Sequence, residues 1–273
     1  MSSAHGSRTQ NSTRIHSHSL SYSNVEQIRS SLGHLQRIFI GFDSDELERF
    51  LKLPVTGRWQ DIGRVNADEH TGELLLRLPS LTKLILIYRE FTAHVDFLSH
   101  LPFLTVLHLV CHNRKKVKAP YVPADTLVAS LMLCPGLTEL DHWGGLNSAH
   151  WAALFVKLTQ LKKLTIRQGD LETLAFFAAG PITHSLEELA LAFISLAPSE
   201  VSHLYALRCL RTLYLDCCFC FSSRLADATI DSLSPPSLLL PSLTELSHVW
   251  LTDTGQPDSL LRKGQSMQER WPQ

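Results

Sequence analysis

The sequence predicts an α/β solenoid with parallel strands on a concave face and helices on a convex face. Three observations predict it. A short leucine motif recurs along the chain, most neighbouring copies lie 23 to 25 residues apart, and the residues between copies show the three- and four-residue apolar spacing of helices. A strand and a helix that alternate at a fixed period indicate stacked, similar units, each of which shares its core with its neighbours.

The motif is L-x-x-L-x-L or a near variant. "LPSLTKL" from Leu78 and "LPSLTEL" from Leu240 differ only at Lys83 and Glu245. The gap of 46 residues between the first two copies hides one decayed copy near "RWQDIGRV", and two gaps of 33 residues each hold an inserted loop. We therefore expect eight to nine irregular units. The clear copies are anchored at Leu35, Leu81, Leu104, Leu137, Leu161, Leu186, Leu210 and Leu243.

Each copy predicts a strand, because residues two apart on a strand point to the same face. Helices are expected between the strands, over residues 92–101, 124–133, 148–158, 170–179 and 199–207. Thr92 and Asp170 are expected to cap two of them, since a side-chain oxygen can accept free first-turn N–H groups. Prolines lack an N–H and disfavour helix in the preceding residue, so we expect helices to end at Pro79, Pro102, Pro135 and Pro241.

Three zones follow. Residues 1–24 are polar and have little to bury, which predicts a disordered tail. Residues 25–253 form the solenoid, and residues 254–273 lose the leucine pattern and are expected to fray.

The repeat resembles the leucine-rich repeat family, whose motif L-x-x-L-x-L-x-x-N/C-x-L recurs every 20 to 29 residues. The resemblance covers about residues 32 to 251 and implies a horseshoe that binds on its concave face. The ninth position of the copy at Leu210 is Cys218, where the family has Asn or Cys. His142 and His248 replace the last leucine of the strand motif, and each needs a hydrogen-bond partner if it is buried.

Cys217, Cys218 and Cys220 contain one C-x-x-C pair, whereas a zinc site needs about four ligands. We expect buried thiols, with a metal or redox site as the alternatives. His108 and His112 would lie about 13 Å apart on a strand, too far to share a metal. No nucleotide-binding or hydrolase motif appears, so we expect no cofactor and no catalytic residues.

The net charge of −1 gives the chain no overall positive field that would attract nucleic acid or acidic membranes. No apolar run approaches the roughly 20 residues that span a bilayer. The N-terminus has no apolar block typical of a secretory signal, which predicts an intracellular protein, cytoplasmic or nuclear. The basic stretch "NRKKVK" from Asn113 is interpreted as a solvated loop, with a nuclear localisation signal or anion patch as the alternative.

The outward strand positions are the candidate binding surface. Trp143, Arg167 and Tyr214 are residue types enriched in interface hot spots, and Asp141 and Asp216 can pair with basic partner groups. We predict that these five form the core of a contact patch for a protein partner. His108 and Lys83 are expected to add to it. The alternative is a merely solvated strand face.

The function predicted is a non-catalytic scaffold that binds a protein on its concave face. The irregular L-P-x-L-T-x-L units resemble the repeat arms of F-box proteins, which implies an adaptor that presents substrates to a ubiquitin ligase, although "LKLPVTGRW" near residue 51 lacks the helical pattern of an F-box. Two other classes remain: a regulator or inhibitor of a target enzyme, and an enzyme whose site lies in the inserted loops.

Overall fold

The computed structural model describes residues 37–38, 44–52, 60–67, 70–88, 95–111, 124–167, 171, 173–178, 180–194, 198–216 and 240–249. Within these ranges nine strands form one sheet, in which every neighbouring pair is parallel and the spatial order is the chain order. The strands are β1 (Arg37–Ile38), β2 (Asp61–Ala67), β3 (Lys83–Tyr88), β4 (Val106–Cys111), β5 (Glu139–Trp143), β6 (Lys163–Arg167), β7 (Glu188–Ala192), β8 (Thr212–Asp216) and β9 (Glu245–Val249).

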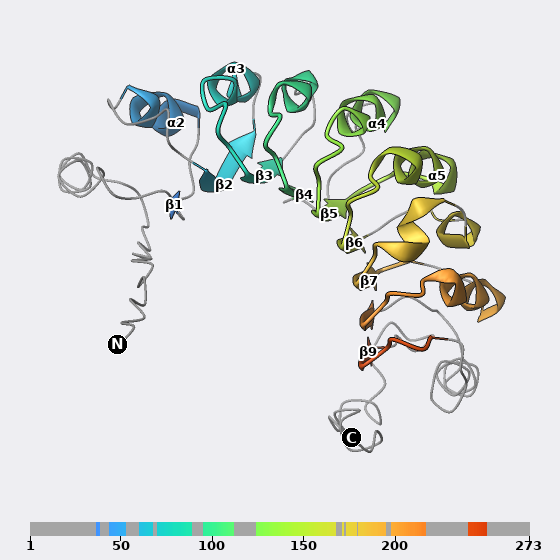
Figure 1. The fold of residues 1–273 in the computed structure, drawn as a ribbon. Helices are drawn as coiled ribbons and strands as arrows, with labels where there is room; N and C mark the ends of the chain where they lie inside the picture. The colour runs from blue at the N-terminus through green and yellow to red at the C-terminus, as the bar shows by residue number, and fades with distance from the viewer. Residues whose placement is uncertain are drawn as a thin grey trace, which may run out of the picture.

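Helices follow the strands on the outer side of an arc, while the strands line its inner side (Figure 1). The chain therefore has the predicted fold, a leucine-rich-repeat solenoid. The α-helices are α2 (Ser44–Leu51), α3 (Thr71–Leu75), α4 (Ala124–Met132) and α5 (Ser148–Lys157). The 3₁₀-helices are η3 (Asp96–His100), η4 (Ala175–Ala178), η5 (Pro181–His184) and η6 (Pro198–Ala206).

The decayed repeat copy is confirmed, because β2 lies where "RWQDIGRV" predicts it, with a register shift between Ile62 and Arg64. The helix prediction is correct for α4 and α5, but the other three expected stretches contain the shorter or tighter helices η3, η4 and η6. A 3₁₀-helix rises about 2.0 Å per residue and so spans more length with fewer residues than an α-helix. The expected caps Thr92 and Asp170 lie outside the described residues; the cap observed is Asn147, whose side chain accepts from the His150 N–H in a capping box.

Prolines mark the turns between helix and strand. Pro79, Pro102 and Pro135 follow α3, η3 and α4, as predicted. Each is the second residue of a four-residue turn; in the first, the Leu81 N–H donates to the Leu78 carbonyl at 3.1 Å. This is the turn position that a fixed proline φ suits best.

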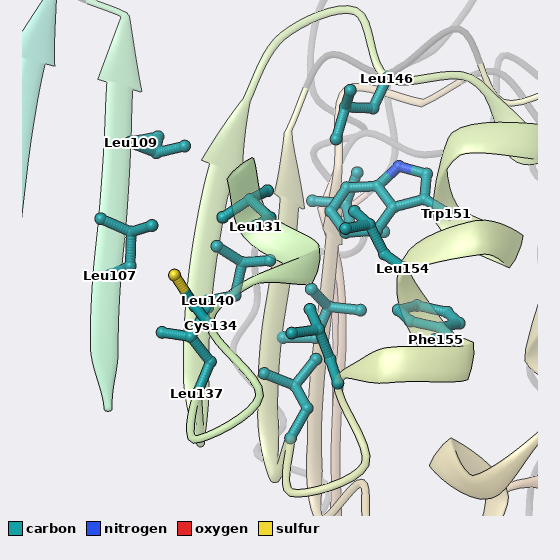
Figure 2. Packing of buried hydrophobic residues seen from close by; sticks show 14 of the residues in the cluster. Leu107, Leu109, Leu131, Cys134, Leu137, Leu140, Leu146, Trp151, Leu154 and Phe155 are labelled. Atoms are coloured by element: carbon teal, nitrogen blue, oxygen red, sulfur yellow. The ribbon is translucent and has the colours of Figure 1, made fainter. Parts of the chain in front are cut away.

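Leucines stack from strand to strand and form the core. Leu84 pairs in register with Leu107, as the motif predicts, and the row continues along the sheet. These leucines are all buried, and helix side chains close the core from the outer side (Figure 2). Each leucine therefore shares its contacts with the coil before and the coil after. The row is Leu84, Leu107, Leu140, Leu164, Leu189, Leu213 and Leu246.

A carbonyl oxygen at the start of each strand joins one coil to the next. The Thr82 carbonyl accepts the backbone N–H groups of Thr105 and Val106 at 2.8 and 3.0 Å, and the Thr105 carbonyl accepts those of Thr138 and Glu139 at the same distances. The hydroxyls of Thr105 and Thr138 add a third bond to these carbonyls, 3.1 Å in each case. This bond gives a role to the threonine in L-P-x-L-T-x-L.

The joints differ along the chain. Thr244 also donates its hydroxyl, to the Arg211 carbonyl at 3.1 Å. The three joints from β5 to β8 lack a hydroxyl, because the donor residues there are Lys162, Glu187 and Arg211. Among the described residues, each of these carbonyls accepts the two backbone N–H groups alone.

An aromatic cluster supports the middle of the arc. Trp151 and Phe155 of α5 point toward the leucine rows (Figure 2), and Phe155 contacts Phe176 and Phe177 of η4 with ring centroids 5.6 and 5.5 Å apart. Nearby, burial raises the pKa of the Cys134 thiol to about 11, so this cysteine is an inert core residue. The cysteines Cys217, Cys218 and Cys220 lie outside the described residues.

His142 is the exception in the core. It occupies a leucine position on β5, is only 3% exposed, and its ring lies edge-on to Trp151 with centroids 5.9 Å apart. Among the described residues neither ring nitrogen has a hydrogen-bond partner. The predicted partner for His142 is therefore wrong, because its neighbours in the register are the apolar Leu109 and Ile166. The side chain of His248 is not among those described.

Removing a threonine hydroxyl tests the hydrogen bonds by which one carbonyl at the start of a strand joins two neighbouring coils. Thr138→Val keeps the shape of the side chain and loses only the bond to the Thr105 carbonyl, so we expect the free energy of unfolding to fall by about 1 kcal/mol. Thr159→Val is the matched control, because Thr159 is exposed and its hydroxyl makes no hydrogen bond among the described residues. Urea denaturation measures both, and equal effects would contradict the role assigned to the hydroxyl.

His142 predicts acid sensitivity. Burial lowers its pKa to about 4, whereas an unfolded histidine titrates near 6.5. The unfolded chain binds the extra proton first, so stability is lost as pH falls from 6.5 toward 4, by about 2 kcal/mol between pH 7.5 and pH 5. We expect His142→Leu to remove this pH-dependent loss of stability. The control His184→Leu changes an exposed histidine, so the loss of stability at pH 5 should remain. Denaturant unfolding at both pH values measures the difference.

Candidate functional site

The concave face consists of three rows of outward side chains on β3 to β9. They alternate with the buried leucines, so the strand register fixes which side chains are neighbours. The first row is Lys83, Val106, Glu139, Lys163, Glu188, Thr212 and Glu245. The second is Ile85, His108, Asp141, Thr165, Ala190 and Tyr214. The third is Ile87, Val110, Trp143, Arg167, Ala192 and Asp216.

Asp141, Trp143 and Arg167 form one cluster on β5 and β6. Two Arg167 nitrogens, Nε and one terminal nitrogen, each donate to a different oxygen of Asp141 at 3.3 Å. The same guanidinium lies over the Trp143 ring, 5.2 Å from the ring centroid. Burial raises the pKa of Asp141, and the Arg167 charge opposes that rise. The structure thus brings three of the five predicted patch residues into direct contact.

Further polar pairs connect the remaining strands. His108 bonds to Glu139 at 2.7 Å, and this hydrogen bond lowers the pKa of Glu139 against the effect of burial. Lys163 forms an ion pair with Glu188 at 3.1 Å. The Tyr214 hydroxyl donates to Glu245 at 3.0 Å. The concave side chains are therefore held by one another along the sheet.

A hollow of about 410 Å³ lies over β7. Its floor contains Ala190 and Ala192, the two smallest outward side chains in the rows. Thr165 and Arg167 of β6 line one wall, and Tyr214 and Asp216 of β8 line the other. Lys163 and Glu188 also border it.

The predicted patch is therefore divided. Its β5–β6 cluster lies on one side of the hollow, and Tyr214 and Asp216 lie on the other. His108 is placed beside the cluster through Glu139, and Lys83 lies in the first row on β3, in line with Glu139 but two strands away. The sequence analysis placed Ala190 and Ala192 on this face but did not recognise the hollow. Two successive small outward residues between larger neighbours were the available signal.

Two kinds of feature are not found in the part of the chain that the structure describes. There, no three His, Cys, Asp or Glu side chains gather as metal ligands, and no helix has the length and apolar character to cross a membrane. His112, the stretch from Asn113 and the C-x-x-C pair lie outside the described residues.

No protein-family model and no curated protein sequence matches the chain. Among solved structures it is similar to an internalin (inlF) from Listeria monocytogenes strain 4b F2365, at 12% identity and a TM-score of 0.45 over 82% of this chain and 57% of that one. It is also similar to TLR13 in a complex with ssRNA13, at 13% identity and a TM-score of 0.38 over 85% of this chain and 28% of that one. The chain thus spans less than two thirds of either protein's length, and neither likeness bears on what it binds.

A double-mutant cycle tests the Asp141–Arg167 pair. The Asp141 side chain is only 16% exposed, so we expect Asp141→Asn and Arg167→Met to show a coupling energy of about 1 to 2 kcal/mol in unfolding experiments. Lys163→Met and Glu188→Gln are the control cycle, because that pair is about half exposed and should couple by less than about 0.5 kcal/mol. Equal couplings would show that partial burial does not strengthen the first pair.

Proposed function

We propose that this chain is a non-catalytic scaffold that holds a protein partner on its concave face. The observation that carries the proposal is the arrangement of Trp143, Arg167 and Tyr214 on nearby strands of one parallel sheet. These residue types supply most of the binding energy in many protein interfaces. Arg167 is already held by Asp141 and Trp143, and Tyr214 by Glu245, so little side-chain entropy remains to be lost on binding.

The pairing of polar groups supports a binding role over a catalytic one. His108, Asp141, Lys163 and Tyr214 each bond to a neighbour on the next strand. The pairs are spread along the sheet. An enzyme site needs a nucleophile, an acid or base and an electrostatic stabiliser that converge on one reacting atom.

A ubiquitin-ligase adaptor and a regulator of a target enzyme are two forms of this function. Both would use the same concave residues. The identity of the bound partner separates them, since an adaptor also recovers ligase scaffold proteins.

Affinity capture with the full chain tests the proposal. We expect Trp143→Ala combined with Tyr214→Ala to lose the proteins that the wild type captures, because both rings are removed from the concave face. Tyr214→Ala alone is measured as well, since Trp143 also packs against the core and the double variant can lose stability. Thermal unfolding of each variant shows whether the fold is retained.

The matched control is Phe103→Ala combined with Val156→Ala. Both residues are 62% exposed and neither belongs to the concave rows, so this variant removes exposed apolar surface elsewhere. It should capture the same proteins as the wild type. A partner that stays with the concave variants and leaves the control variant would refute the proposed surface.

A further inference from the structure

We propose that the hollow over β7 receives one large apolar side chain, aromatic or aliphatic, from an exposed segment of the protein partner. This inference rests on the proposed function and names the partner's chemistry at one position of the concave face. Four features support it: the width of the hollow, the pairing of the charges that line it, its apolar floor, and a strained aromatic residue at the end of that floor.

The hollow has the width of a side chain. Thr165 and Tyr214 stand on the strands either side of Ala190, in the same row. Neighbouring strands are about 4.8 Å apart, so the backbones that carry these two walls are separated by roughly 10 Å. An α-helix with its side chains is about 10 to 12 Å wide and does not enter the space between them. A single side chain does, and the volume of about 410 Å³ leaves room for a large one.

The charges that line the hollow balance and are already paired. The lining contains two cations and two carboxylates. Lys163 pairs with Glu188 at 3.1 Å. Arg167 is held by Asp141 at 3.3 Å, and Asp216 also interacts with another group of the chain. A charged group that entered would give up its hydration and meet only groups that are already satisfied, which costs free energy. The lining therefore favours an uncharged group.

The floor of the hollow is apolar, and its backbone is occupied. β7 is hydrogen-bonded to β6 and to β8 over its whole length, so the sheet takes up its N–H and C=O groups. The floor then presents the methyl groups of Ala190 and Ala192. Thr165 in one wall is only 8% exposed and adds little polar surface, while the Tyr214 ring in the other wall is exposed. Apolar surface inside a rim of paired polar groups is typical of the place where an interface buries an anchor residue.

An aromatic residue lies at the end of the floor. Phe193 follows Ala192 directly, is exposed, and donates its N–H to the Asp216 carbonyl at 2.8 Å. Its φ of 57° lies in the left-handed region, which a bulky residue rarely adopts. After β5 the same turn position is Gly144, whose N–H donates to the Arg167 carbonyl in the same way. The chain thus keeps an aromatic residue beside the hollow where glycine would be unstrained, and such strain is common at binding sites.

A random peptide-display library, selected on the immobilised full chain, tests this inference. We expect the selected peptides to share a large apolar residue at one fixed position. A synthetic copy of one such peptide should bind at least about tenfold more weakly when that residue is alanine, and lysine there should do no better than alanine. The loss caused by alanine should stay the same as salt is raised, because a contact between uncharged groups is not screened.

Variants of the chain locate the peptide. Ala190→Phe fills the hollow from its floor and Ala190→Asp places a charge there, so we expect each to weaken binding about tenfold or more. Val106→Phe and Val106→Asp are the matched controls, because they make the same changes on β4 of the same face, away from the hollow. Each control should change the dissociation constant by less than about twofold. If Ala190→Phe does not fold in a thermal unfolding experiment, Ala190→Asp still locates the contact, because it adds less bulk.

Several outcomes would overturn the inference. Selected peptides that share a charged residue instead, or binding that tightens with Ala190→Asp, would show that the hollow takes a charged group. Binding that is unaffected by both Ala190 variants but lost with Trp143→Ala would exclude the hollow and leave the scaffold function intact. Peptides that ignore every concave substitution, or a library that yields none, would count against both.

Discussion

The structure depends on the contact between each leucine and its counterparts one coil away. A coil of about 24 residues loses roughly 24 to 48 kcal/mol of backbone entropy on ordering, far more than its own few leucines return. In the row from Leu84 to Leu246, each buried leucine packs against the leucines of both neighbouring coils. These contacts between coils help to offset the entropy loss. Everything on the concave face follows, because an inward leucine at every second position forces the residues between them outward.

Much of this could be predicted from sequence because it is periodic. The leucine spacing alone placed the strands, their parallel order and the outward side of residues such as Trp143 and Tyr214. The type of helix could not be predicted in the same way, since apolar spacing does not distinguish α5 from the 3₁₀-helix η6. Nor could it be predicted that His142 has no hydrogen-bond partner among the described residues, because that depends on which side chains surround the ring in three dimensions.

The candidate site, like the fold, could be predicted from the sequence only in part. Residue type and outward direction were readable for Asp141 and Arg167, yet their pairing joins residues 26 positions apart and depends on the register between two coils. The hollow depends on that register even more, because two alanines make a depression only if larger side chains stand beside them. The repeat pattern indicates that Cys217, Cys218 and Cys220 are buried thiols. These residues lie outside the described ranges, so their burial stays a prediction.

The carbonyl joints also bear on how the arc deforms under load. A force along the solenoid passes through each joint in turn, so bending concentrates where a joint has fewest bonds. The joints between β5 and β8 have two backbone bonds where those at Thr105 and Thr138 have three, and the strands they connect include both walls of the hollow. A change of curvature in this segment would therefore alter the spacing of those two walls, because they stand on strands joined through the two-bond carbonyls.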